Sequence, residues 1–370
     1  MNASFGQQSA VNARRLALKL SLYVLIHVIQ FGAGVVEAVW IAIEEPPIGV
    51  RYATVFIGAT GGMMNGVVYL TVFFRNMSVE ILLENIFTDI GEGPHWDEAT
   101  QTLYFVDNIG QRVFSWNYKT KEVQKIQLDK YIGFIIPRAN GGHVIGYGKT
   151  ISTLDWDTKN VSLITEVDTN VVTNVNDAKC DTRGRLWFGT LGVEISADGK
   201  GSLYCLYTDG TVKKHMEKIA ISNGLAWTSD NKRMYYIDSI PGKVYGMDYD
   251  IETGTFNNEQ VIIDFKAIGT LGFPDGMTID TEDKLWIACF NGGKVVRFDP
   301  DTGKQLQSID FPAKRISSCC FGGPNYDELF VTCGRTAAPE EELKEFPLSG
   351  SLFRVTGLGV KGLKPSVYEG

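Results

Sequence analysis

The sequence predicts an all-β protein, a six-bladed β-propeller, preceded by a two-helix transmembrane hairpin. The propeller is predicted because short β-rich runs recur at near-constant intervals through residues 79–370, with no long helical period among them. The hairpin is predicted because two long, almost uncharged stretches lie within residues 1–78. The 370 residues carry 35 Lys and Arg against 43 Asp and Glu, a net charge of −8. This balance offers no basic stripe to a phosphate backbone and argues against a nucleic-acid partner.

Residues 1–78 form the predicted membrane segment, with helices at about 16–43 and 50–74. The second stretch holds 23 residues without a formal charge, from 52 to 74, and about 20 are needed to cross the hydrocarbon core. Arg14, Arg15 and Lys19 precede the first helix, and Arg75 follows the second. By the positive-inside rule we expect both ends of the hairpin, and the propeller after it, to lie in the cytoplasm. Six scattered cysteines agree with that reducing compartment.

Other interpretations of this segment stay open. A signal peptide followed by a buried helix is disfavoured, because neither stretch ends at a small-residue cleavage site after about 15–30 residues. The stretch from Asn65 to Tyr69 resembles the seventh helix of a seven-helix receptor, which indicates a receptor remnant fused to a propeller. If the segment is an artefact of the gene model, the expected protein is a cytoplasmic propeller without an anchor.

Six β-rich runs mark the repeat in residues 79–370. They begin at Leu103, His143, Leu186, Met234, Leu285 and Leu329, with spacings of 40, 43, 48, 51 and 44 residues. Most are followed by a second β run, as expected for propeller blades of 40–50 residues. A sandwich or barrel is disfavoured because it does not require such regular spacing. We expect the segment that begins at Val79 to close the ring by pairing with the C-terminal strands.

Polar side chains stand at one register just before these runs, where a propeller blade meets the rim of the central channel. They are Glu92, Asn176, Asn223, Asp275 and the pair Ser317 and Ser318. Repeat geometry should bring Glu92, Asn223 and Asp275 to one axis, and two carboxylates with an amide oxygen suit Ca²⁺, Mg²⁺ or Mn²⁺. Asn-Gly and Asp-Gly are also common turn dipeptides, but three polar residues at one register favour a metal site. No Gly-x-Ser-x-Gly motif indicates a serine hydrolase, and no His–Cys cluster indicates structural zinc.

The motifs around these positions resemble the regucalcin (senescence marker protein) and gluconolactonase family, with its luciferin-regenerating-enzyme-like members. The resemblance covers about residues 85–370 and rests on Gly91-Glu-Gly-Pro-His-Trp, Ile221-Ser-Asn-Gly-Leu-Ala-Trp, Pro274-Asp-Gly-Met and Ser318-Cys-Cys-Phe-Gly-Gly. It implies a six-bladed propeller that hydrolyses sugar lactones. It also implies one divalent cation in the channel, Ca²⁺ foremost, with Zn²⁺, Mn²⁺ or Mg²⁺ as alternatives.

The same resemblance implies roles for individual residues. Glu92, Asn223 and Asp275 fall on the metal ligands of the family, and Asn176 and Glu194 fall on its substrate-binding residues. Where the family has an Arg two residues before that Asn, this chain has Asn174. A short amide cannot make the forked, charged contact of a guanidinium, so we expect Asn174 to alter substrate preference or turnover.

The sequence therefore predicts a metal-dependent lactonase. The metal would polarise the lactone carbonyl, and Asp275 would activate the attacking water. The alternative is a calcium-binding regulatory protein of the regucalcin type without turnover. The expected partners are a small-molecule lactone and, through residues 16–74, a membrane.

Overall fold

The computed structural model describes residues 36–44, 50–59, 68–75, 77–194, 196–269 and 271–370. The chain divides into two compact units, Met1–Asn76 and Met77–Gly370. The described part of the first unit is a three-stranded antiparallel sheet in the order β1 (Val36–Glu44), β2 (Val50–Ala59), β3 (Val68–Arg75).

These three strands replace the helices predicted at 16–43 and 50–74, wherever those ranges are described. The sequences VEAVWIAIE and VYLTVFFR are rich in β-branched and aromatic residues, which favour extended backbone over helix. Among the described residues, no helix has both the length and the apolar character to cross a bilayer. The rest of the predicted hairpin, and Asn65 of the receptor-like stretch, lie outside the described residues.

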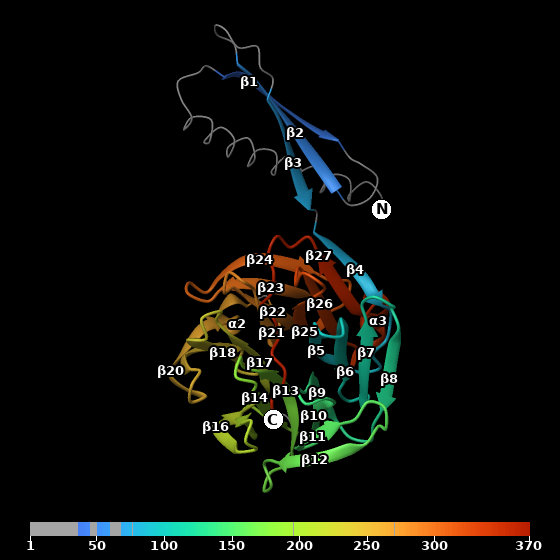
Figure 1. Cartoon of the computed structure of the whole chain (residues 1–370), viewed down its shortest axis with the longest axis vertical. Coiled ribbons are helices and arrows are strands. Elements are labelled where there is room, and N and C mark those ends of the chain that lie inside the picture. Colours follow the sequence, from blue (N-terminus) through green and yellow to red (C-terminus); the bar gives the residue numbers. More distant parts are fainter. Residues whose placement is uncertain (1–35, 45–49, 60–67, 76, 195, 270) are drawn as a thin grey trace. The chain divides into compact units, whose positions relative to one another are not determined.

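The second unit is the predicted six-bladed propeller, in which six four-stranded antiparallel sheets follow one another around a ring (Figure 1). Blade 1 consists of β5 (Gly91–Asp97), β6 (Thr102–Asp107), β7 (Arg112–Asn117) and β8 (Val123–Gln127). Blade 2 consists of β9 (Ile132–Pro137), β10 (His143–Tyr147), β11 (Thr150–Leu154) and β12 (Val161–Glu166). Blade 3 consists of β13 (Thr173–Cys180), β14 (Leu186–Gly192), β15 (Gly201–Leu206) and β16 (Val212–Ile219). Blade 4 consists of β17 (Ser222–Trp227), β18 (Arg233–Asp238), β19 (Lys243–Asp250) and β20 (Thr255–Asp264). Blade 5 consists of β21 (Phe273–Ile279), β22 (Leu285–Phe290), β23 (Lys294–Asp299) and β24 (Lys304–Asp310).

Blade 6 closes the ring with strands from both ends of the unit. It consists of β25 (Arg315–Gly322), β26 (Glu328–Gly334), β27 (Leu352–Thr356) and, as its outer strand, β4 (Ser78–Leu83). β4 pairs antiparallel with β27, so that Val79 lies opposite Val355, and the predicted closure is confirmed. Two short helices, α2 (Phe265–Ile268) and α3 (Glu340–Glu345), lie in connections.

Each of the six β-rich runs that defined the repeat supplies the second strand of a blade: β6, β10, β14, β18, β22 and β26. Their large side chains are buried between neighbouring blades. Phe330 of the run in blade 6, for example, stacks on Trp96 of the inner strand of blade 1, with ring centroids 5.7 Å apart. The regular spacing therefore reflects one buried layer per blade.

The innermost strands share a distortion that exposes particular side chains to the channel. Antiparallel pairing is interrupted after Glu92 in β5, after Val175 in β13, after Asn223 in β17 and after Pro274 in β21. Such β-bulges re-aim side chains and are common beside binding sites. Here they place the predicted polar residues at one level of the channel.

Candidate functional site

A cavity of about 540 Å³ opens at the end of the channel where the inner strands begin. Glu92, Asn176, Asn223 and Asp275, all predicted site residues, lie together at its floor and are at most 8% exposed. In each of the six blades, the residue two positions before the floor position lies at the mouth of the cavity. These six residues form a second ring. These are Ile90, Tyr131, Asn174, Ile221, Phe273 and Arg315. Alternate residues of a strand share a face, so both rings point into one cavity.

Two blades place no carboxylate or amide side chain at the floor. In blade 2 the position is Gly133, where an added Cβ would lie 2.3 Å from the carbonyl oxygen of Asn176. In blade 6 it is Ser317, which is fully buried and donates its hydroxyl to the carbonyl of Gly91 at 2.5 Å. The polar floor therefore comes from blades 1, 3, 4 and 5.

The two floor carboxylates are buried close to one another without a cationic partner. Burial raises the pKa of Glu92 well above its usual value, and the charges of Asp275 and Asp177 raise it further. Burial also raises the pKa of Asp275, with Asp177 as the second cause. Within the described residues neither Glu92 nor Asp275 has an ion pair, and each has one backbone N–H bond, from Gly93 and Gly276. Such a pair either retains a proton or attracts a cation.

A chain of hydrogen bonds orients the amides beside these carboxylates. Asn108 Nδ2 donates to the hydroxyl of Tyr131 at 3.0 Å, and that hydroxyl donates to Asn176 Oδ1 at 2.7 Å. Asn176 Nδ2 then donates to Asn223 Oδ1 at 3.1 Å, and Asn223 Nδ2 donates to Ser239 Oγ at 2.8 Å. The chain holds Asn223 with its amide oxygen at the floor.

This donor set fits a hard divalent cation. Two carboxylates and an amide oxygen are ligands that Ca²⁺, Mg²⁺ and Mn²⁺ favour. No group of three or more His, Cys, Asp or Glu side chains is placed to hold a metal in the described part of the chain. A cation at this floor would therefore need the amide of Asn223 as well as Glu92 and Asp275.

The two remaining predicted residues lie in different places. Asn174 lines the mouth of the cavity. Glu194, in the connection after β14, does not line it; its side chain is 90% exposed, with Oε2 4.0 Å from Lys200 Nζ.

Six polar lining residues were missed from the sequence: Asn108, Tyr131, Ser239, Asn291, Arg315 and Thr336. Tyr131 and Arg315 stand at the register of Asn174, in blades 2 and 6, so the blade alignment itself was the signal.

The guanidinium of Arg315 is already engaged. Its Nε donates to Glu342 Oε1 at 2.9 Å, and its Nη atoms donate to the carbonyls of Thr336 and Ala337. Lys314 Nζ also donates to Glu342, at 3.1 Å. The donors of Arg315 are therefore occupied, while Glu342 offsets one of the two positive charges.

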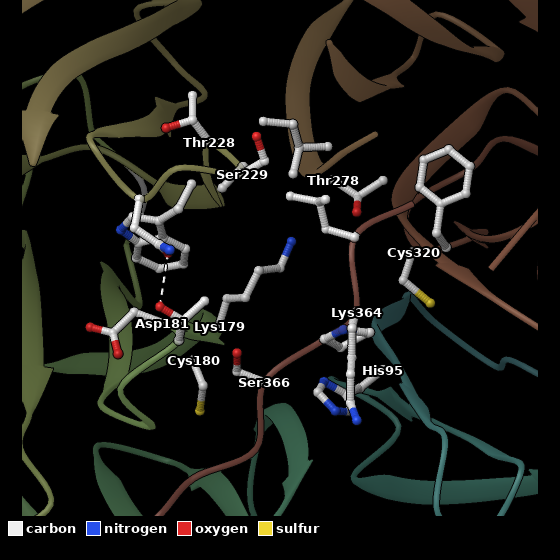
Figure 2. Close-up of a pocket in the computed structure, with 18 of the residues that line it drawn as sticks. His95, Lys179, Cys180, Asp181, Thr228, Ser229, Thr278, Cys320, Lys364 and Ser366 are labelled. Atoms are coloured by element: carbon white, nitrogen blue, oxygen red, sulfur yellow. Dashed lines mark hydrogen bonds between the residues drawn. The ribbon is translucent and has the colours of Figure 1, made fainter. Parts of the chain in front are cut away.

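A second cavity, of about 260 Å³, lies where the inner strands end, partly lined by residues 363–366 of the C-terminal tail (Figure 2). Lys179 extends through its middle and donates from Nζ to the carbonyl of Met277 at 2.6 Å; burial lowers the pKa of Lys179. Burial, with Lys179 as the second cause, lowers the pKa of His95 to about 3, so the imidazole is neutral at pH 7. Cys320 here and the five other cysteines are buried free thiols. None of these residues belongs to the carboxylate floor.

Comparison with known proteins agrees with this geometry. Residues 90–335 match the family described as the SMP-30/Gluconolactonase/LRE-like region. The chain belongs to this family. Regucalcin of Xenopus laevis is 44% identical over 286 residues, and human regucalcin is 41% identical over 285; each match covers 76% of this chain and 95% of the relative. Among solved structures, a luciferin-regenerating enzyme matches with a TM-score of 0.74 and 36% identity, over 80% of this chain and 100% of that chain. The predicted family resemblance is confirmed.

Proposed function

We propose that this protein is a divalent-cation-dependent lactonase of the gluconolactonase type, acting on sugar lactones, with Ca²⁺ as the first candidate cation. One observation carries the proposal: two buried carboxylates and an oriented amide oxygen share a cavity floor without a cationic partner among the described residues. The family description, which names gluconolactonase, and the name regucalcin of the relatives support it.

In this proposal Glu92, Asn223 and Asp275 hold the cation. When bound, the cation polarises the lactone carbonyl and stabilises the oxyanion that develops on attack. Asp275 accepts a proton from the attacking water as the general base. The water oxygen bonds to the carbonyl carbon, the ring C–O bond breaks, and the leaving alkoxide takes the proton from Asp275. The product is a hydroxy acid, which releases one proton at neutral pH.

The remaining predicted residues bind substrate. Asn176 at the floor and Asn174 at the mouth offer amide groups to the lactone's polar substituents. Glu194, the third substrate-binding residue implied by the resemblance, contacts substrate only if its carboxylate leaves the surface beside Lys200. Its neighbour Val193 already lines the cavity.

The test uses the full chain, stripped of metal with a chelator. Proton release from glucono-δ-lactone is followed after addition of Ca²⁺, Mg²⁺, Mn²⁺ or Zn²⁺, with the uncatalysed rate subtracted. The proposal expects turnover that requires a cation and is lost in Asp275→Asn. Cation binding without turnover on any lactone would instead support the calcium-binding regulatory protein. Absence of both binding and turnover would contradict both functions.

We also propose a cytoplasmic location for the propeller, because its six cysteines are free and buried. Protease protection in intact cells, with a tag after residue 370, tests this. Cleavage of the tag from outside the cell would overturn it.

A further inference from the structure

The walls of the cavity differ in chemistry around the ring. Blades 3, 4 and 5 contribute a mainly apolar wall, in which the polar residues Asn174, Ser239 and Asn291 lie among six apolar ones: Leu191, Val193, Ile221, Ile240, Phe273 and Phe290. The wall is continuous: Leu191 and Ile221 form a β-bridge, and Phe273 lies opposite Phe290 in the pairing of β21 with β22. On the remaining blades the lining combines the polar residues Asn108, Tyr131, Arg315 and Thr336 with the smaller apolar contribution of Ile90, Ile109 and Ala337. A ligand on the floor therefore meets an apolar surface on one side.

This apolar wall continues outward into solvent. Val193 is 55% exposed and Phe273 is 40% exposed, although most large apolar side chains of the propeller are buried. Val172, which is 73% exposed, joins the same rim, because Val193 N donates to its carbonyl at 3.2 Å. Apolar side chains left in water beside a polar floor favour a ligand that covers them.

The opposite side offers few free cationic donors to an acidic substituent. Arg315 is the one cationic side chain among the described lining residues, and its guanidinium is occupied by Glu342 and two backbone carbonyls. Hydroxyls placed against Ile221, Ile240 or Phe290 would lose hydrogen bonds to water without replacement.

We infer that the preferred substrate is a lactone that carries an apolar substituent, with its ring on the carboxylate floor and its substituent on the wall of blades 3–5. The inference rests on the proposed lactonase function and replaces sugar lactones by alkyl-substituted lactones as the preferred substrate class. The covalent step is unchanged: water adds to the carbonyl carbon, and the ring C–O bond breaks.

The experiment measures kcat/KM of the full chain, with Ca²⁺ added, for three δ-lactones that share a six-membered ring. δ-Valerolactone has no substituent, δ-octalactone has a propyl group, and glucono-δ-lactone has hydroxyl groups. Each buried carbon of the propyl group should raise kcat/KM about fourfold. With partial to complete burial of its three carbons, we expect kcat/KM to be about 10- to 60-fold higher for δ-octalactone than for δ-valerolactone. Glucono-δ-lactone is expected to fall below δ-octalactone.

A matched pair of variants assigns the preference to the wall. Val193→Ser removes two methyl groups from the cavity and should lower the octalactone-to-valerolactone ratio about three- to tenfold. Val261→Ser makes the same change at a valine of similar exposure, 50%, on the outer strand β20, and should leave the ratio unchanged.

The outcomes separate the inference from the function beneath it. If kcat/KM is highest for glucono-δ-lactone, or equal for δ-valerolactone and δ-octalactone, the inference is overturned but the proposed lactonase function is not. An octalactone preference that survives Val193→Ser would also overturn the inference. No turnover of any lactone with any cation would remove the proposed function, and the inference would fall with it.

Discussion

Replacing Asp275 by Asn should stabilise the metal-free protein while removing its function. The substitution keeps the shape of the side chain and removes one buried carboxylate charge, which raises the pKa of Glu92. Two unit charges 4–6 Å apart repel by about 3–4 kcal/mol at an effective dielectric constant of 20. Because the wild-type pair relieves part of this repulsion by retaining a proton, we expect Asp275→Asn to raise the free energy of unfolding by about 1–3 kcal/mol.

The assay is urea unfolding followed by tryptophan fluorescence at pH 7.5, in EDTA and in Ca²⁺. Calcium at about one hundred times its Kd should stabilise wild type by about 2.7 kcal/mol and the variant much less. Asp310→Asn is the control: that carboxylate is 80% exposed and pairs with Lys294 at 3.3 Å, so little change is expected. If Asp275→Asn in EDTA is no more stable than wild type, the two floor carboxylates do not repel one another as argued.

Three further predictions follow from the described structure. Because burial raises the folded-state pKa of Glu92 and Asp275 above their unfolded values, the stability they contribute is present below about pH 4 and lost as pH rises through the folded values. In EDTA, the free energy of unfolding of wild type should therefore fall, relative to that of Asp275→Asn, by about 1.4 kcal/mol for each retained proton and each unit that the pH rises. If the free energies of unfolding of the two proteins instead change in parallel with pH, this prediction is contradicted. Tyr131→Phe leaves Asn176 Oδ1 without its donor and should lower kcat about tenfold with little change in KM or calcium affinity, whereas an unchanged kcat would show that the hydroxyl does not position the amide. A chain that begins at residue 84 lacks β4 and should melt well below a chain that begins at Met77, and equal melting temperatures would show that the outer strand is dispensable.

The blade number and the floor of the site were predictable because both depend on short-range sequence. Runs such as those at Leu103 and Leu186 encode a buried strand within one blade, and blades repeat at the same interval. Glu92, Asn223 and Asp275 stand 10 or 11 residues before the runs of their blades, so the repeat alone brings them to one cavity. The blade number and the floor residues could therefore be predicted without knowledge of how distant parts of the chain pack together.

The helix prediction was wrong at residues 36–44, 50–59 and 68–75, because length and hydropathy do not separate an apolar strand from an apolar helix. Residues 52–74 are uncharged and long enough for a span, yet residues 50–59 and 68–75 are two strands. The β-branched and aromatic content of the runs was the better signal.

The missed residues of the site depend on comparisons between blades. Tyr131 lies in a blade whose floor position is Gly133, so no acidic or amide residue marked that register. Arg315 precedes Ser317, whose hydroxyl is used internally. Glu194 lies in the connection after β14, where the repeat sets no conformation, and its position required the structure.

The floor ring and the mouth ring of the cavity come from two positions of the same inner strands and have different roles. The floor residue sets the chemistry, because its oxygen faces the space where a cation and a carbonyl would meet. The residue two positions earlier shares that face but lies at the mouth, where it meets what the substrate carries. If the protein is the proposed lactonase, exchange of Asn174, Phe273 or Arg315 should change which lactone is preferred without changing the donor set beneath it. The same floor would then serve lactones with different substituents, and the apolar residues of this cavity would favour those with an apolar substituent.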